Sequence, residues 1–361
     1  MSVTPEPNVV VVGGGIVGAS IAWHLAPEAN VTVIAEDLGG VATPNSFAWI
    51  NAATEDKTYY DFRIRSIERW IEINKKLPNL PIHWSKALSW NQPEDELEEF
   101  LENHAAWGYD IVRVNQTEIT DIEPKLESNG VPDWAVLSGQ EGAMEAELVA
   151  IQLIENSEAA FGAKLLETKV TGFIKNEHGS IGGVITPDGE VRADHVVLAA
   201  GLGSVPLLAA ENIRLPLSGR EGLLINTRPT KENLLNTLIN GDQLHMRQTL
   251  EGRIRSGKDF SGGDTDGDPQ KAADELFAKV QKAFKGGDKL EYDYYTIGVR
   301  PDPEDGLPIL GPTGLSGLTV AVMHSGVTNA AVVGDLLSKQ ILRNVSGPLL
   351  SPYRLDRFEK K

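Results

Sequence analysis

The stretch from residue 8 to 36, NVVVVGGGIVGASIAWHLAPEANVTVIAE, constrains the fold of this 361-residue chain most strongly. Its four consecutive valines are typical of a parallel strand buried on both faces, because β-branched side chains suit a covered, pleated surface. Gly13, Gly15 and Gly18 follow with the spacing G-x-G-x-x-G. In this motif the first glycine permits a tight turn, the second lets the backbone approach a pyrophosphate, and the third lets helix pack on strand.

A helix is predicted from Ile16 to about Ala26, and its first amides, at Ile16 and Val17, carry the partial positive charge that suits phosphate. A second apolar run then ends at Glu36, whose carboxylate can accept hydrogen bonds from both hydroxyls of an adenosine ribose. This order predicts a site for the ADP part of a dinucleotide, and the acid disfavours NADP. The alternative is a glycine-rich turn that binds no ligand.

Composition narrows the classes of function. The chain has 51 acidic and 33 basic residues, a net charge of −18, which disfavours nucleic acid and anionic membranes as partners. It has no cysteine, which excludes disulfides, thiolate metal sites, cysteine nucleophiles and a cofactor linked through sulfur. No segment approaches the roughly 18 to 20 apolar residues of a membrane span, and the start MSVTPEP lacks the basic residues of a signal peptide. We therefore expect a cytoplasmic protein large enough for two domains.

Residues 37–55 are rich in small side chains, which would let this segment pass close to a flat ring. Two interpretations are open for each polar or aromatic candidate within it. Trp49 is either a wall of the ring site or part of the core. Thr43 and Ser46 either donate to a pyrophosphate or cap a turn.

Apolar periodicity predicts the remaining elements. Helices are expected over 57–77, 93–108, 117–123 with Thr117 as N-cap, 145–162, 270–285, and from about 328 with Thr328 or Asn329 as cap. Strands are expected over 82–90, 109–114, 163–173, 195–201, 222–226, 243–248, 253–257 and 318–323.

One strand and one loop are candidates for ligand sites. The apolar strand over 195–201 is predicted to re-enter the first sheet, which would place Ala200 and Gly201 at its carboxyl end, where ligands of open α/β sheets bind. The aspartates of the loop over 261–268 resemble part of a calcium site, but their spacing does not complete an EF-hand. No metal site is predicted.

Four motifs together resemble the D-amino-acid oxidase superfamily of FAD enzymes, especially its glycine oxidase and monomeric sarcosine oxidase branch. They are GGGIVGASIAWHLA with Glu36, VVLAAGLGS at 196–204, GVRPDPEDGLPILG at 298–311 and HSGVTNAA at 324–331. The resemblance implies an α/β fold with a Rossmann-like FAD-binding domain of the glutathione reductase/p-hydroxybenzoate hydroxylase type. That domain would comprise 1–80, 140–215 and 296–361, and an α+β substrate domain with an antiparallel sheet would comprise 81–139 and 216–295.

The resemblance also implies where FAD binds. Gly13, Gly15 and Gly18 would hold the pyrophosphate, Glu36 the ribose and the Val170 backbone the adenine, with Gly201 close to the cofactor and Gly326, Val327 and Thr328 facing the pyrimidine edge of the flavin. The amino end of a helix there would stabilise the negative charge of reduced flavin. Sarcosine oxidases attach flavin through a cysteine, and some mitochondrial relatives attach it through a histidine just after the second strand. This chain has neither, so FAD is expected to bind noncovalently.

For the substrate, the resemblance points to Arg300 in the sequence G-x-R-P, whose guanidinium would pair with a carboxylate through both oxygens. The alternative is an arginine that pairs with the acidic loop after it, Asp302, Glu304 and Asp305. His245 matches a substrate-contacting position, although a structural role fits equally, and His324 is placed beside the flavin. Arg247 and Arg255 are weaker substrate candidates, and His24 is assigned to packing.

The predicted reaction is oxidation of the C–N bond of an amino acid or N-alkyl amino acid, with hydride transfer to flavin N5 and hydrolysis of the imine. Dioxygen or an electron carrier would be the acceptor. Three rivals remain: an FAD-dependent 2-hydroxy-acid dehydrogenase with His245 or His324 as base, an NAD-dependent dehydrogenase, and a non-catalytic flavin-binding subunit. The substrate side chain, its stereochemistry and the oligomeric state are not fixed by the sequence.

Overall fold

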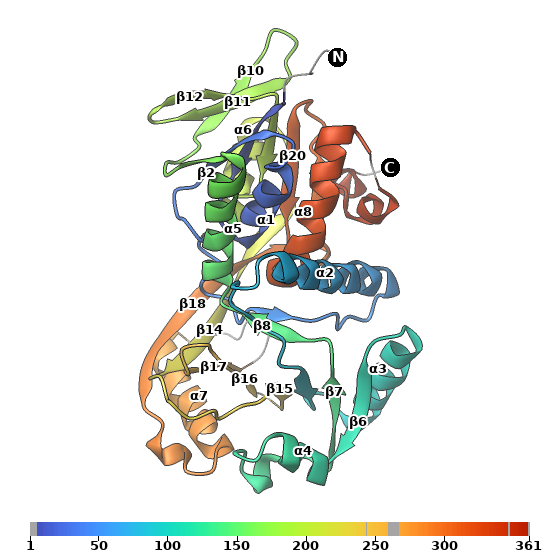
Figure 1. Ribbon diagram of the computed structural model, residues 1–361, viewed down its shortest axis with the longest axis vertical. Helices are drawn as coiled ribbons and strands as arrows, with labels where there is room; N and C mark the ends of the chain where they lie inside the picture. The colour runs from blue at the N-terminus through green and yellow to red at the C-terminus, as the bar shows by residue number, and fades with distance from the viewer. Residues whose placement is uncertain (1–5, 243, 259–266, 346, 360–361) are drawn as a thin grey trace.

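The computed structural model describes residues 6–242, 244–258, 267–345 and 347–359 (Figure 1). Its helices are α1 (Ile16–Leu25), α2 (Lys57–Lys76), α3 (Glu94–Ala106), α4 (Gln116–Ile122), α5 (Ala146–Phe161), α6 (Ser204–Ala210), α7 (Pro269–Ala283) and α8 (Gly326–Arg343). Among these residues, no helix has both the length and the apolar character that a membrane span requires.

A six-stranded sheet, in the order β19-β20-β13-β1-β2-β9, forms the upper part of the molecule in Figure 1. Its strands are β1 (Asn8–Val12), β2 (Asn30–Ile34), β9 (Lys164–Leu166), β13 (His195–Leu198), β20 (Leu318–Val322) and β19 (Ile309–Pro312). All neighbours pair in parallel except β19 with β20. The predicted return of the chain to the first sheet is confirmed, because β13 pairs with β1.

The two faces of this sheet have different covers. Val9 and Val11 pack into a core with α1, α2, α5 and α8, whereas Val10 and Val12 pack into a second core on the opposite face. That second core is closed by α6 and by a small antiparallel sheet of β10 (Gly172–Lys175), β11 (Ile181–Thr186) and β12 (Gly189–Arg192). The four valines are therefore buried on both faces, as their sequence predicts.

An eight-stranded sheet, in the order β18-β14-β17-β16-β15-β5-β7-β6, forms the lower part. Its strands are β18 (Tyr292–Pro303), β14 (Leu217–Thr227), β17 (Ile254–Gly257), β16 (Leu244–Gln248), β15 (Leu238–Gly241), β5 (Ala87–Ser89), β7 (Trp134–Ser138) and β6 (Ile111–Asn115). Only the β15–β5 pair of this sheet is parallel. The long strands β14 and β18 run side by side from this sheet toward the six-stranded one (Figure 1).

The two parts are joined by shared packing as well as by long strands. A short sheet of β3 (Trp49–Ile50), β8 (Gly142–Met144) and β4 (Ile82–His83) lies between them, and Ile111 of β6 belongs to the same core as α2. Against the opposite side of the eight-stranded sheet, α7 closes a separate core. We propose that the chain divides into two domains, with boundaries at residues 80, 140, 215 and 296. The separate core closed by α7 supports this division.

Two predicted strands are wrong in extent. The segment 82–90 divides into β4 and β5, which belong to different sheets, and Lys86 between them has a left-handed backbone with φ 63°. The segment 163–173 divides into β9 and the start of β10, and Val170 lies between them outside any strand. In both segments polar residues separate the two strands, Ser85 and Lys86 in the first and residues 167–169 in the second, and the prediction joined the strands across them.

Two predicted helix caps are also wrong. Asn115, not Thr117, caps α4, because its side chain accepts from the Glu118 amide while the Glu118 side chain accepts from the Asn115 amide. The last helix begins at Gly326 after Ser325, so Thr328 lies in its first turn. The predicted aspartate loop at 261–268 lies outside the described residues as far as 266. Within the described part of the chain, no cluster of His, Asp or Glu could hold a metal.

Candidate active site

A cavity of about 800 Å³ lies where the carboxyl ends of the parallel strands meet β14, β16 and β18. Its size is within the range of roughly 300 to 1,000 Å³ that is usual for ligand sites. Segments far apart in the chain line it, including Gly13, Glu36, Gly201, Arg300 and Gly326. The four glycine-rich motifs therefore meet around one space.

The glycine loop shapes one end of the cavity. Gly13 has φ 115°, and a Cβ on it would lie 2.4 Å from the Ala199 carbonyl oxygen. Gly15 is the N-cap of α1, which has no side-chain cap, and Ile16 N donates to Thr43 Oγ1 at 3.2 Å. Gly18 lies behind the loop, outside the cavity lining, where a Cβ would come within 2.0 Å of Gly13 O. Gly18 thus lets α1 approach the strand, and the amino end of α1 faces the cavity.

The next candidates lie along the same wall. Glu36 and Val170 line the cavity, and Glu36 pairs with Lys169 at 2.9 Å. Both partners of this pair are largely exposed, so it adds little stability and leaves the carboxylate accessible. Val17, Ala200 and Gly201 also line the space.

Thr43 and Ser46 hold a turn and line the cavity at the same time. Ser46 Oγ donates to Thr43 O at 2.7 Å, and Thr43 Oγ1 accepts from the amide of Ile16. Each hydroxyl oxygen thus has a structural hydrogen bond at the cavity edge.

Trp49 lines the cavity and is anchored from behind by a buried acid. Its Nε1 donates to Glu141 Oε2 at 2.7 Å, and Tyr109 OH donates to Glu141 Oε1 at 2.5 Å. The Ala52 amide in turn donates to Tyr109 OH at 3.2 Å. Burial raises the pKa of Glu141 to about 7, against the opposing effect of these donors and of Arg63. No sequence pattern marked Glu141, which lies between β7 and β8.

The amino end of α8 faces the cavity from the opposite side. Ser325, its N-cap, has a left-handed backbone with φ 55° and makes no side-chain cap. Gly326, Val327 and Thr328 line the cavity. Thr328 Oγ1 donates to Trp49 O at 3.1 Å, which ties the helix to the Trp49 wall. The helix therefore presents its partially positive end to the cavity, and the Ser325 side chain does not cap it.

Arg63 of α2 lines the cavity and was not predicted from the sequence. It is 6% exposed and donates from Nε to Asn51 O (3.0 Å), from Nη2 to Asn51 Oδ1 (2.6 Å) and from Nη1 to Ser325 Oγ (3.3 Å). The helical spacing marks Arg63 as unusual, because it lies three residues after Tyr60 and four before Ile67, on the apolar face of the helix. A charged residue on that face has to find a buried role.

Arg300 lies in the cavity on β18, opposite Arg220 of β14. The three acids that follow Arg300 in the sequence each form an ion pair with another arginine. Asp302 pairs with Arg220 at 2.9 Å, Glu304 with Arg214, and Asp305 with Arg357 at 2.7 Å. Each of these three acids therefore has an arginine partner, and Arg300 itself is a lining residue of the cavity.

Two histidines also line the cavity. His324 Nδ1 lies 2.9 Å from Ser325 Oγ, and burial, reinforced by the charge of Arg300, lowers the pKa of His324 to about 4. It is therefore neutral at pH 7. His245 is 2% exposed, and its ring packs edge-on against Phe47 with centroids 4.5 Å apart. His245 thus makes a packing contact at the cavity edge.

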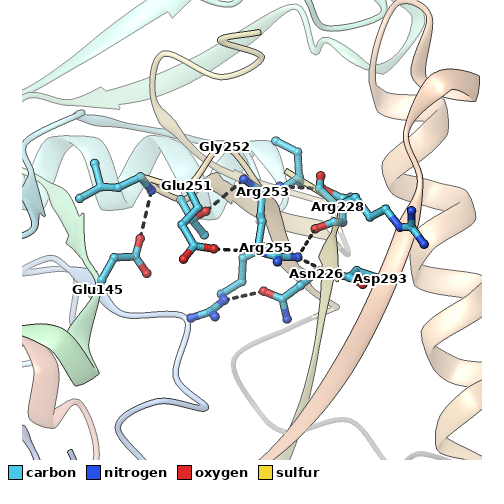
Figure 2. A network of polar contacts seen from close by, with 12 residues as sticks. Glu145, Asn226, Arg228, Glu251, Gly252, Arg253, Arg255 and Asp293 are labelled. Atoms are coloured by element: carbon cyan, nitrogen blue, oxygen red, sulfur yellow. Dashed lines mark hydrogen bonds and ion pairs between the residues drawn. The ribbon is translucent and has the colours of Figure 1, made fainter. Parts of the chain in front are cut away.

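Arg247 and Arg255 lie outside the cavity lining and bind backbone and side-chain groups of the protein instead. Arg247 Nε donates to Phe47 O at 2.7 Å, and its Nη1 pairs with Glu145 at 2.9 Å. Arg255 Nε donates to Asn226 Oδ1 at 2.9 Å, a contact visible in Figure 2, and its Nη1 donates to Ser46 O at 3.3 Å. The two arginines fasten the cavity segment 46–47 to the eight-stranded sheet.

His24 is also remote from the cavity. Its Nδ1 contacts Ser20 O at 2.7 Å, and its Nε2 accepts from Arg69 Nε at 3.2 Å. These contacts agree with its assignment to packing.

Comparisons with known proteins identify what this arrangement is similar to. The family model described as FAD dependent oxidoreductase matches residues 8–340. The bifunctional protein ThiO/ThiG of Nostoc sp. is 25% identical over 98% of this chain, which spans only 55% of that relative's length. Glycine oxidase of Bacillus licheniformis is 23% identical, with 98% of both chains covered. The crystal structure of glycine oxidase from Geobacillus kaustophilus superposes with a TM-score of 0.85, at 20% identity, over 98% of this chain and 100% of that one.

Proposed function

We propose, since this chain belongs to the family of FAD-dependent oxidoreductases, that it oxidises the C–N bond of an amino acid or N-alkyl amino acid. One observation carries the proposal: the guanidinium-bearing Arg300 lines the same cavity as the glycine loop and the amino end of α8. The relatives named glycine oxidase support the same reaction class. The glycine loop and α8 provide the cofactor site, and Arg300 provides the carboxylate site.

The residues present fit FAD. Two helices, α1 and α8, direct their amino ends at one cavity, and electron-rich groups are the ligands that such ends attract. The amides near Gly15 and Ile16 would hold the pyrophosphate, Glu36 the ribose, and the amides of Gly326 and Val327 the pyrimidine edge. FAD supplies the two-electron oxidation when it is bound.

Arg300 would bind and orient the substrate. A guanidinium engages both oxygens of a carboxylate at once, which fixes the plane of the carboxylate and hence the position of the adjacent carbon that bears the amine. Phe47, Leu224 and His245 are buried and line the same cavity. Their rings and alkyl groups would exclude water from the reacting carbon.

The protonation of His324 suits a substrate that binds as a neutral amine. With a pKa of about 4, His324 is uncharged at pH 7, so the positive charge near it comes from arginines, with Arg300 the foremost of them. A cation at His324 would compete with Arg300 for the carboxylate and repel a protonated amine. A neutral bound amine needs no dedicated base.

Anaerobic titration tests this function. The purified flavoprotein is exposed to a panel of D-, L- and N-methyl amino acids and to the matching 2-hydroxy acids, and the visible flavin absorbance is followed. The proposal expects bleaching by amino acids and none by hydroxy acids. Bleaching by hydroxy acids alone would instead support a 2-hydroxy-acid dehydrogenase, and no bleaching by either class would support a non-catalytic flavin-binding subunit.

Admission of air to the bleached protein identifies the acceptor. Rapid return of the yellow colour with formation of hydrogen peroxide would assign dioxygen. Slow return, with rapid turnover on an added artificial acceptor, would assign an electron carrier.

A further inference from the structure

We propose that Arg63 raises the reduction potential of the bound flavin by holding a buried positive charge beside its pyrimidine edge. This inference rests on the proposed FAD site, in which the amino end of α8 meets that edge. Arg63 donates to Ser325, the N-cap of α8, and lines the cavity together with Asn51, Ser325 and Gly326.

Neutral acceptors surround the guanidinium of Arg63. Its hydrogen-bond acceptors are the Asn51 carbonyl, the Asn51 amide oxygen and the Ser325 hydroxyl, all of them neutral. Its guanidinium also lies 5.3 Å from the centroid of the Tyr59 ring. Among the described residues, no carboxylate lies within ion-pair distance of Arg63. Buried charges in proteins are normally paired, because desolvation without compensation is costly.

The surroundings make this arrangement more costly. The partial charge at the amino end of α8 has the same sign as Arg63, and the two meet at Ser325. The charge of Arg63 lowers the pKa of Glu141, but burial has the larger effect and raises that pKa to about 7. At neutral pH Glu141 therefore carries only part of a negative charge. The region around Ser325 is therefore positive on balance and faces a cavity.

An electron-rich ligand in the cavity would offset both positive features. Two-electron reduction of a flavin with uptake of one proton at N5 leaves one negative charge, spread over N1 and the C2 carbonyl. Arg63 and α8 would therefore bind reduced flavin more tightly than oxidised flavin. Such a difference in affinity is, by thermodynamic linkage, a rise in the reduction potential of the bound cofactor.

The test compares potentials in four variants of the FAD-loaded protein. Arg63→Gln removes the charge, Arg63→Lys keeps it, and Asn51→Asp adds a carboxylate at the atom that accepts from Nη2. Arg69→Gln is the matched control, because Arg69 also belongs to α2 but pairs with Glu72 and Asp335 away from the cavity. Potentials are measured by equilibration with reference dyes during slow chemical reduction, without an amino acid.

We expect Arg63→Gln and Asn51→Asp each to weaken the preference for reduced over oxidised flavin at least tenfold, a fall of about 30 mV for a two-electron couple. Arg63→Lys retains most of the preference and Arg69→Gln all of it. If Arg63→Gln fails to fold, the nearly isosteric Asn51→Asp still decides the matter. The inference is overturned if Asn51→Asp, and Arg63→Gln where it folds, prefer reduced over oxidised flavin to within twofold of the wild-type preference.

Two further outcomes separate this inference from the proposed function. A variant with unchanged potential but a raised KM for amino acids would make Arg63 a substrate ligand, which overturns the inference and leaves the reaction intact. A wild-type protein that no amino acid reduces, but whose potential falls in Arg63→Gln, supports the inference while the proposed function fails. Chemical reduction makes this distinction because it needs no substrate.

Discussion

Gly222 of β14 lies against the guanidinium of Arg300 on β18: a Cβ built on Gly222 would lie 3.3 Å from Nη2 and 3.5 Å from Cζ. The two strands are paired here, with Gly222 opposite Gly298 and Arg220 opposite Arg300. The missing side chain at 222 leaves the space that the arginine side chain occupies. The direction of Arg300 thus depends on a neighbouring strand as well as on its own.

Gly222→Ala is therefore expected to displace the Arg300 guanidinium by a few tenths of an ångström and to raise KM for amino acids severalfold, with kcat less affected. Gly222→Val should have a larger effect. Steady-state kinetics with FAD-saturated enzyme measure both. Gly182→Ala is the matched control, because a Cβ there would meet nothing within 4 Å. Equal KM values in wild type and Gly222→Val would remove this packing role.

Arg300→Ala should keep the yellow colour and lose affinity for carboxylated substrates. A hydrogen bond to a charged group contributes about 1.5 to 3 kcal/mol, so KM should rise by roughly ten- to a hundredfold. Arg300→Lys should recover part of the loss, since lysine keeps the charge without the two-pronged geometry. Arg214→Ala, which removes a largely exposed arginine paired with Glu304, serves as the control. Unchanged Michaelis constants in Arg300→Ala would exclude Arg300 from the site.

Glu141 predicts a pH dependence of stability. Because burial raises its pKa from 4.5 to about 7, the folded protein retains a proton between these values that the unfolded chain releases. This contribution to stability is fully present below pH 4.5 and is lost as pH rises through 7, at up to about 1.4 kcal/mol per pH unit. Glu141→Gln should flatten that part of the profile in denaturant unfolding. Glu98→Gln, at an exposed ion pair, should not; identical slopes in wild type and Glu141→Gln would contradict the assignment.

Arg247→Met should destabilise the protein by about 3 to 5 kcal/mol, because it leaves the carboxylate of Glu145 partly buried without its main partner and frees the Phe47 carbonyl. Chemical denaturation measures the loss. Arg228→Met makes a suitable comparison, since Arg228 is also a paired arginine but is exposed and pairs with Glu291 at 3.3 Å. Losses of similar size in both variants would argue against the anchoring role of Arg247.

The start of the chain could be predicted well because its determinants are local. The strand, glycine turn, helix and second strand between Asn8 and Glu36 each follow from residues a few positions apart. The pairing of β13 with β1 also followed from pattern, because a fully apolar strand that ends on glycine has few other places to lie. The joining of four motifs at one cavity followed from the family resemblance.

The remaining site residues depend on tertiary contacts that no local pattern records. Glu141 acquires its role from Tyr109 and Trp49, which lie 32 and 92 positions away along the chain. Arg247 shares a strand with His245, yet only the latter reaches the cavity, because the segment 46–47 covers the former. Alternation along a strand gives a shared face but not what covers that face.

The most direct test of the account is anaerobic mixing of the FAD-loaded protein with an amino acid and, separately, with the amine that lacks only its carboxylate. The account predicts that the amino acid bleaches the flavin and yields the corresponding 2-oxo acid, whereas the amine reacts far more slowly. Equal bleaching by both compounds would contradict the role of Arg300. A flavin that stays oxidised with every amino acid of the panel would contradict the reaction itself.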